Sequence, residues 1–506
     1  MSGTTNAYDD FVYPTYAFPQ THPDLLGTLA VLFGLQATPS DRCRVLELGC
    51  AGGGNLLPLA AALPNSQFVG IDYSARQIEM AQSRLKMLGL ANIEFRHASI
   101  TDVDAGYGQF DYILCHGVYS WVPENVQDAI LRVCAENLSS KGVGYISYNT
   151  LPGWHLRGMV REMMSYHDAR HINATPQQRV AQARALLAFL NEATTGQQTP
   201  YASQLRQELE ALRQVPDEYI YHEHLEEHNA PIYFFEFEER LRDRGLRFLG
   251  ESHFPSMMHQ NLPEPIRKRL TAVAPDLIQM EQYLDFVKNR TFRQSLICHA
   301  SRRPSHAVTG DRLMNMVALS SLKPSGNGFV TPGGQTVATE QPGLRAALTA
   351  LSEAWPLALP VEELCKRGAP TNPEEVATML LNLYAVGGAT LLGLWGHLPS
   401  YAGRPSERPV VWPIARWMAK ETNRATGLRH ETVNLDQIDR QILPLLDGSH
   451  SRSMLRDRLV ELFRKGELTV NREGTVAKDE HQARAIINDV LTQKLNRYAE
   501  LALLTS

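Results

Sequence analysis

Two acidic residues end two apolar segments near the N-terminus, and both could hold a ligand with hydroxyl or ammonium groups. Glu47 follows Val45-Leu46, and Asp72 ends "QFVGID" at residues 67–72. A carboxylate at such a position accepts hydrogen bonds from a ribose diol or binds a cation. Beside Glu47 a pyrophosphate would be repelled, because like charges at short range cost energy. Either acid alone could merely cap a turn; together they favour a positively charged nucleoside ligand without phosphate.

The loop between these segments is rich in glycine. Gly49 and Gly54 match the first and last glycines of the dinucleotide fingerprint GxGxxG, but Ala51 replaces the middle one. Glycines let the backbone approach a ligand closely. S-adenosylmethionine (SAM) carries sulfonium and ammonium groups and no phosphate, so we predict it as the cofactor. The residues expected to contact it here are Glu47, Gly49, Cys50, Ala51, Gly53, Asn55, Asp72, Tyr73 and Gln77.

A third β-prone segment, "IEFRHAS" at residues 93–99, ends where an adenine ring is expected. Many methyltransferases carry Asp at the position of Ser99. Its absence leaves Ser99, the Ile100 backbone or Asp102 as the adenine contact, and the sequence does not choose among them.

The elements that must position these groups follow a repeated strand–loop–helix pattern. Residues 110–117 and 142–149 are further apolar, β-prone segments, and the helix pattern of residues 123–138 separates them. "FEFEERLRDRGLRFLGESHF" (235–254) predicts a helix, a stop at Gly245 and a strand, and "FRQSLICH" (292–299) predicts a last strand. We therefore predict an α/β fold, a Rossmann-like seven-stranded sheet with ligands at the strand C-termini.

Four motifs resemble one family. "FPQTHP" (18–23), "VLELGCAGGGN" (45–55), "HGVYSWVP" (116–123) and "SYNTLPGW" (147–154) are similar to class I SAM-dependent methyltransferases that carry a methyltransferase regulatory domain. The most similar group is the rickettsial-type protein-lysine methyltransferases of outer-membrane proteins. The resemblance is densest over residues 8–165 and recurs at 219–237 and 283–299. It implies a lysine acceptor on a protein substrate, an outer-membrane or surface protein met before export.

The two narrower motifs place aromatic and amide groups where the methyl should point. A lysine must be neutral to attack, and desolvation among rings lowers its pKa, while rings also attract the ammonium. The candidates for this acceptor site are His116, Tyr119, Trp121, Tyr148, Asn149 and Trp154. His116 could accept a proton, contact the cofactor or only bond to backbone, and the rings could simply pack the loops.

Two other segments carry candidate residues. The N-terminal "YDDFVYPTYAFPQTHP" predicts a lid over the cofactor, with Tyr8, Tyr13 and His22 as candidates, or an arm packed on the sheet. Farther on, "HLEEH" (224–228) matches the HxxEH zinc pattern, but no third ligand is evident, so we expect no metal. We expect neighbouring residues to line the acceptor pocket: His222, Glu223 and Glu226.

The remaining chain suggests separate domains. Linker-like stretches precede two similar helix–turn–helix–helix–strand patterns that predict winged-helix-like domains, which we expect to dock proteins or dimerise. The expected domains are 1–165, the SAM-binding core with its lid; 166–300, a helical insertion and regulatory region completing the sheet; 301–400, a winged-helix-like middle domain; and 401–506, a C-terminal winged-helix-like domain.

Composition limits the function classes. A net charge of -5 and mixed charges along every helix give no basic stripe for nucleic acid, and no apolar run is long enough to cross a membrane. No signal peptide is evident and the six cysteines form no CxxC pair, which favours the cytoplasm. We expect a protein-lysine methyltransferase, with a homodimer left open. A small-molecule methyltransferase and a SAM-binding winged-helix regulator of DNA remain as alternatives.

Overall fold

The computed structural model describes residues 15–170, 174–369, 371–469, 471–472, 475–477 and 479–505. Tyr8 and Tyr13 of the expected lid lie outside these residues.

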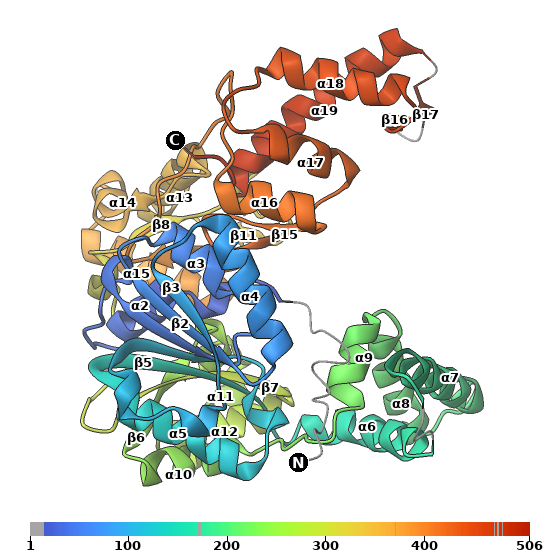
Figure 1. Cartoon of the computed structure of the whole chain (residues 1–506). Helices are drawn as coiled ribbons and strands as arrows, with labels where there is room; N and C mark the ends of the chain where they lie inside the picture. The colour runs from blue at the N-terminus through green and yellow to red at the C-terminus, as the bar shows by residue number, and fades with distance from the viewer. Residues whose placement is uncertain are drawn as a thin grey trace.

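A seven-stranded mixed sheet in the order β3-β2-β1-β4-β5-β7-β6 forms the centre of the molecule (Figure 1). β7 pairs antiparallel with both β5 and β6, whereas the first five strands pair in parallel. The strands are β1 (Arg44–Leu48), β2 (Gln67–Asp72), β3 (Ile93–His97), β4 (Phe110–Cys115), β5 (Leu138–Asn149), β6 (Leu246–Glu251) and β7 (Phe292–His299). The predicted Rossmann-like sheet is confirmed, including its two late strands.

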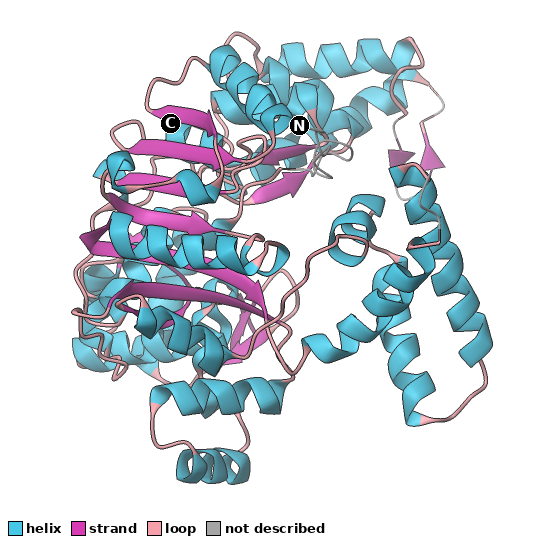
Figure 2. Cartoon of the chain, turned by 60° about the horizontal axis from the view of Figure 1, so that its bottom comes forward, coloured by secondary structure: helices cyan, strands magenta, loops and turns pink. Residues whose placement is uncertain are grey.

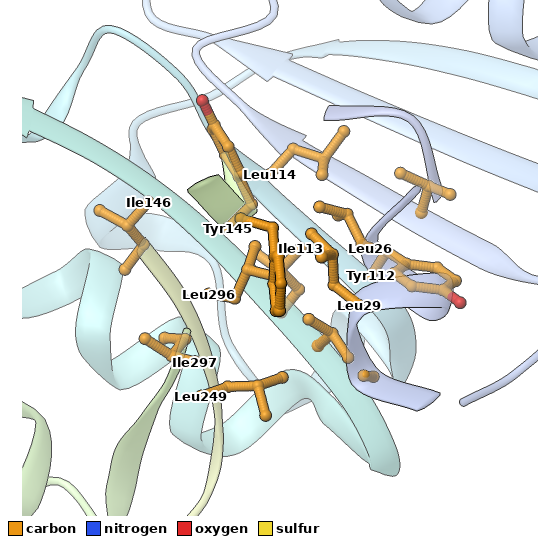
Figure 3. Close-up of a cluster of buried hydrophobic side chains, with 14 of the residues drawn as sticks. Leu26, Leu29, Tyr112, Ile113, Leu114, Tyr145, Ile146, Leu249, Leu296 and Ile297 are labelled. Atoms are coloured by element: carbon orange, nitrogen blue, oxygen red, sulfur yellow. The ribbon is translucent and has the colours of Figure 1, made fainter. Parts of the chain in front are cut away.

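Helices cover both faces of this sheet (Figures 1 and 2). On one face lie α2 (Pro23–Leu32), α3 (Leu56–Ala62) and α4 (Ala75–Leu88); on the other lie α5 (Glu124–Asn137) and α10 (Phe234–Asp243). In Figure 3, apolar side chains of β4, β5 and β7 lie together with Leu26 and Leu29 of α2, both fully buried. Burial of one such leucine stabilises the fold by about 1.5–3 kcal/mol, so this layer fixes the strand ends that carry the polar groups.

Between β5 and β6 the chain inserts a group of helices that stands beside the sheet (Figure 1). They are α6 (Trp154–Asp168), α7 (Pro176–Thr194), α8 (Pro200–Arg213) and α9 (Asp217–His224). These helices bury their own apolar cluster, which includes Val160, Leu187, Leu205 and Ile220. The insertion therefore has its own core and approaches the sheet through α6 and α9.

A buried ion cluster fixes the end of β7. Arg293 is 1% exposed and its guanidinium contacts the carboxylates of Glu251, Glu281 and Asp285 at 2.6–3.1 Å. Glu281 and Asp285 lie on α12 (Leu277–Lys288), which follows α11 (Glu264–Val273). The cluster thus ties α12 to β6 and β7 beside the site described below.

Two further helical units follow the sheet. The first contains β8 (Val317–Leu319), β9 (Lys323–Ser325), β10 (Gly328–Val330), β11 (Thr336–Ala338), α13 (Pro342–Ala354), β12 (Leu359–Pro360), α14 (Val361–Arg367), α15 (Pro373–Gly387) and β13 (Gly393–Trp395). The second contains α16 (Pro413–Glu421), β14 (Arg424–Thr426), β15 (Thr432–Asn434), α17 (Gln437–Ile442), α18 (Arg452–Arg464), β16 (Asn471–Arg472), β17 (Thr475–Val476) and α19 (Glu480–Glu500). The first unit shares a buried cluster with the sheet, while the second has its own.

All six cysteines are buried and free of disulfide bonds. None of the helices in the described residues is long and apolar enough to span a bilayer.

Candidate active site

A cavity of about 870 Å³ opens at the C-terminal edge of the sheet, where β1, β2, β4 and β5 end. It extends from the glycine-rich loop after β1 to helix α9 of the insertion. Most of the predicted site residues line it: Glu47, Gly49, Cys50, Ala51, Asn55, Asp72, Tyr73, Gln77, Ser99, Ile100, His116, Trp121, Asn149, Trp154, His222, Glu223 and Glu226.

Most backbone donors of the glycine-rich loop are bonded to other protein groups. The N–H groups of Gly49 and Cys50 both donate to the Ile71 carbonyl at 2.9 Å, and the Gly54 N–H donates to Thr15 Oγ1 at 2.6 Å. A phosphate-binding loop instead points free N–H groups at its ligand. The loop is therefore unsuited to a pyrophosphate, in agreement with the reasoning from Glu47.

Glu47 lines the cavity, and one oxygen of its carboxyl group has no partner in the described part of the chain. Its Oε1 accepts from Asn55 Nδ2 at 2.7 Å, while its buried Oε2 has no partner among the described residues. Burial raises the pKa of Glu47 to about 8, against the hydrogen bond from Asn55 and with the help of nearby Asp72. A buried carboxyl with one free oxygen is suited to a cation, because the ion pair offsets the cost of burial.

Asp72 stands at the end of β2 and is held by backbone donors. Its Oδ2 accepts from the Ala51 N–H and its Oδ1 accepts from the Ser74 N–H, both at 2.8 Å. Beyond it, Ser99 caps a short turn and lines the cavity with Ile100, whereas Asp102 does not line it. The nucleoside end of the cavity is therefore bounded by Asp72 on one side and Ser99-Ile100 on the other.

Gly53 does not line the cavity and has a structural place instead. It has a φ of +77°, and an added Cβ would lie 2.7 Å from the Phe95 ring. Glycine is thus needed there to pack the loop on β3, and the expected contact of Gly53 with the cofactor stays a prediction.

The far half of the cavity carries aromatic and amide groups. The rings of Trp121 and Trp154 lie edge to face, with centroids 6.2 Å apart. Asn149 ends β5, and its buried Nδ2 makes no hydrogen bond within the described residues. This half can therefore receive a group that combines an apolar stem with a polar tip.

Helix α9 adds acidic groups opposite these rings. Burial raises the pKa of Glu223 to about 7, although Arg157 and Arg161 oppose that shift. Burial also raises the pKa of Glu226, and the charge of Arg179 opposes that shift. Glu223 can thus bind a cation or accept a proton near neutral pH, and Glu226 adds a second carboxyl group to this half.

Two of the predicted acceptor residues are placed elsewhere. Tyr119 is fully buried, its ring 5.5 Å from Phe237, and Tyr148 packs on the same ring at 4.2 Å. The Tyr148 hydroxyl lies 3.2 Å from Ser295 Oγ and that of Tyr119 3.4 Å from Arg240. Neither lines the cavity: Tyr148 lies in β5 and Tyr119 in the short 3-10 turn after β4, and both rings pack on Phe237 of α10.

His22 is also displaced from its expected role. Its Nδ1 accepts from the Asp24 N–H at 3.1 Å and caps α2, and its ring packs against Trp395 and His430. His22 therefore packs between the start of α2 and the residues Trp395 and His430, and it does not line the cavity. Tyr13 lies outside the described residues.

His116 lies between the two halves of the cavity. Its Nδ1 is 2.9 Å from the Tyr145 hydroxyl, and its ring lies 4.1 Å from that of Phe18. Burial lowers the pKa of His116 to about 4. The imidazole is therefore neutral near pH 7 and is a weak proton acceptor.

Several lining residues were not anticipated from the sequence. Thr15 and Phe18 line the cavity and belong to residues 15–22, which we call the N-terminal strap. Phe292 begins β7 and lies opposite Asn149 in the antiparallel pairing, which brings it to the cavity. Arg157 and Tyr219 come from the insertion and were not among the predicted site residues.

The HxxEH pattern does not form a helical metal site. Helix α9 ends at His224, so His224 and His228 do not share a helical face. In the described part of the chain, no group of three or more His, Cys, Asp or Glu side chains could hold a metal ion.

Comparisons with known proteins agree with this geometry. Three family models match: a methyltransferase domain over residues 45–142, a predicted methyltransferase regulatory domain over 216–299, and the C-terminal winged helix domain of PKMT over 407–503. The uncharacterized protein RP789 of Rickettsia prowazekii is 35% identical over 99% of this chain and 94% of its own length. A second uncharacterized protein of that organism, RP028, is 40% identical over 48% of this chain and 96% of its own length.

A solved structure extends the comparison to the cofactor. PKMT2 from Rickettsia typhi in complex with AdoHcy, S-adenosylhomocysteine, superimposes with a TM-score of 0.88 at 30% identity. The match covers 98% of this chain and 100% of that one. AdoHcy carries an ammonium group and no phosphate. The unpaired oxygen of Glu47 and the bonded backbone donors of the glycine-rich loop fit such a ligand, so SAM is the cofactor. The chain belongs to the family of class I SAM-dependent methyltransferases that carry a methyltransferase regulatory domain and a PKMT-type C-terminal winged helix domain.

Proposed function

We propose that this methyltransferase modifies lysine side chains of a protein substrate. The PKMT2 structure and the PKMT winged helix model support this, since the abbreviation denotes protein-lysine methyltransferases. The supporting observation in the molecule is the single cavity that joins Glu47 to the acidic helix α9. One end of this cavity can hold the cofactor and the other can hold a cation. This arrangement suits the transfer of a methyl group to an amine.

The first half of the cavity is assigned to the cofactor. Glu47 holds the methionine ammonium with its free Oε2, and Asp72 accepts from the ribose hydroxyls. Ser99 and Ile100 border the adenine. When bound, SAM supplies an electrophilic methyl group on its sulfonium.

The second half is assigned to the acceptor lysine. Trp121 and Trp154 surround its aliphatic stem and attract its ammonium, and Asn149 orients the nitrogen. The amine must lose a proton before it can attack. Glu223, with a pKa of about 7, suits that role better than His116, with a pKa of about 4.

The finer assignments follow the family resemblance. We propose an outer-membrane or surface protein as the substrate, met in the cytoplasm before export. We also propose that the domains span residues 1–165, 166–300, 301–400 and 401–506. We propose in addition that two copies of the chain form a homodimer. The separate apolar cluster of the insertion supports its treatment as a unit that shapes the acceptor side.

Labelled SAM tests the proposal directly. The protein would be incubated with labelled SAM and either lysine-rich unfolded proteins or a small-molecule fraction of a cell extract. Mass spectrometry of proteolytic peptides should locate the label on lysine Nζ. Label confined to small molecules, or to residues other than lysine, would refute the lysine assignment and leave the methyltransferase activity intact.

A further inference from the structure

The C-terminal domain contacts the cofactor loop through one histidine. His430 lies in the turn between β14 and β15, has a φ of +63° and is 2% exposed. Its Nε2 is 2.8 Å from Oδ1 of Asn55, which is 375 positions away in the chain. Figure 1 shows α16 and β15 beside α3 and α4, and Ala61, Ala62 and Leu88 pack on the cluster of that domain. The contact is thus part of a packed interface.

The hydrogen-bond directions in this contact can be derived. Asn55 Nδ2 donates to Glu47 Oε1 at 2.7 Å, so the amide oxygen of Asn55 faces His430. An amide oxygen only accepts, and therefore Nε2 of His430 carries the proton. The result is a directed chain from His430 through Asn55 to Glu47, which lines the cavity and whose other oxygen has no partner among the described residues.

The same hairpin holds the N-terminal strap. Thr432 Oγ1 donates to the Ala17 carbonyl at 3.3 Å, and the Arg424 guanidinium lies 4.0 Å over the Tyr16 ring. The strap in turn contacts the loop, because the Phe18 N–H donates to Asn55 Oδ1 at 3.0 Å. The strap is therefore enclosed between the cofactor loop and the C-terminal domain.

We infer that His430 is a positioning residue for the cofactor, and that docking of the C-terminal domain completes the methionine end of the site. Its N–H polarises and orients the Asn55 amide, which holds Glu47 with one oxygen toward the cavity. The inference rests on the assignment of Glu47 to the methionine ammonium. In this inference, the C-terminal domain contributes to cofactor binding through the side chain of His430.

A matched pair of substitutions tests this role. His430→Asn tolerates the positive φ but places its amide too close to the backbone to reach Asn55. His430→Gln places an amide nitrogen near the position of Nε2 and restores the donor. Calorimetric titration with S-adenosylhomocysteine should show about three- to tenfold weaker binding for His430→Asn and a change within about twofold for His430→Gln. Equal effects of both variants, or none, would overturn the inference.

The control lies in the same turn. Glu431 pairs with Arg429 at 3.1 Å and its side chain is 45% exposed. Glu431→Gln removes that pair without touching Asn55 or the strap, so its affinity should match that of the unmodified protein. If it weakens binding as much as His430→Asn does, the effect is a general loosening of the hairpin and the inference fails.

A double-mutant cycle separates this inference from the Glu47 assignment. Glu47→Gln alone should weaken binding, and adding His430→Asn should then cost less than about twofold, because both act through one chain. Full additivity would overturn the coupling but keep Glu47. An unchanged affinity of Glu47→Gln would overturn both.

A measurement on the unmodified protein covers the case of variants that fail to fold. Coupling is reciprocal, so the ligand should protect the hairpin as well as the loop. On addition of S-adenosylhomocysteine, amide hydrogen exchange should slow over residues 424–434 and 49–55. Slowing confined to residues 49–55 would overturn the inference.

Discussion

The N–H of Ala51 donates to Oδ2 of Asp72 over 2.8 Å, so the cofactor loop and the second acid of the site form one unit. Ala51 adopts a φ of +46°, a conformation uncommon for residues other than glycine. The bond to Asp72 supports this turn at the position where a dinucleotide fingerprint has its middle glycine. The carboxylate thus shapes the loop and lines the cavity at the same time.

Asp72→Ala should therefore weaken cofactor binding. The loss of a charged acceptor for the ribose hydroxyls costs about 1–3 kcal/mol, and the freed Ala51 N–H adds to that loss. Calorimetry with S-adenosylhomocysteine measures it, with Asp128→Ala as a control, since Asp128 is an exposed residue outside the cavity. An unchanged affinity in folded Asp72→Ala protein would contradict the assignment.

Glu47 should make cofactor binding depend on pH. Its pKa is raised from 4.5 to about 8, so below pH 8 the empty site holds a proton that an ammonium must displace. Affinity should rise by up to about tenfold per pH unit between pH 6 and 8 and level off above. Glu47→Gln should abolish this slope, and a slope that persists in the variant would assign the proton to another group.

The raised pKa of Glu47 should also make the folding stability of the protein without cofactor fall as the pH rises, whereas the cofactor affinity increases. Between pH 4.5 and about 8 the unfolded chain releases the Glu47 proton while the folded chain keeps it. The contribution of Glu47 to stability is full below pH 4.5 and is lost as the pH rises to about 8. Comparison of the unmodified protein with Glu47→Gln in urea unfolding across that range isolates this contribution.

The cofactor half of the site could be predicted from the sequence because its residues are local to strand ends. Glu47, Asp72 and Ser99 each follow an apolar β-prone segment, and parallel strands bring such ends together. The acceptor half could be predicted only in part. Whether a ring after β4 faces the cavity depends on tertiary packing: Trp121 faces it, and Tyr119, two residues earlier, does not. The contact of His430 with Asn55 has no signal in the sequence at all.

Tyr119→Phe should accordingly leave both activity and cofactor binding nearly unchanged. The hydroxyl makes only a 3.4 Å contact with Arg240, and the ring stays packed on Phe237. We expect turnover and affinity within about twofold and a loss of stability near 1 kcal/mol. Single-turnover assays and thermal unfolding check this, and a large fall in turnover with unchanged stability would restore the acceptor role first expected for Tyr119.

Arg293→Met should strongly destabilise the protein. Removal of the guanidinium leaves the buried Glu251 without its cation, and Glu281 and Asp285 then share Arg290 alone. A broken buried ion cluster costs about 3–5 kcal/mol. Denaturant unfolding measures the loss, with Arg269→Met on the exposed side of α11 as the control. A loss below about 1 kcal/mol would mean that the carboxyls protonate or rehydrate at little cost.

Glu223→Gln should lower turnover without changing cofactor affinity. The amide keeps the shape of the carboxyl but cannot accept the proton that an acceptor amine must lose, an effect worth about 10²–10⁴-fold in rate. Because the pKa of Glu223 is about 7, the rate of the unmodified protein should rise through pH 7, and the variant should lose that step. Single-turnover methylation of a lysine-containing protein between pH 6 and 9 measures both effects.

Glu218→Gln, on the same helix but outside the cavity, should retain the rate and the pH profile of the unmodified protein. A slower variant that keeps the step at pH 7 would show that Glu223 positions the acceptor and that another group takes the proton.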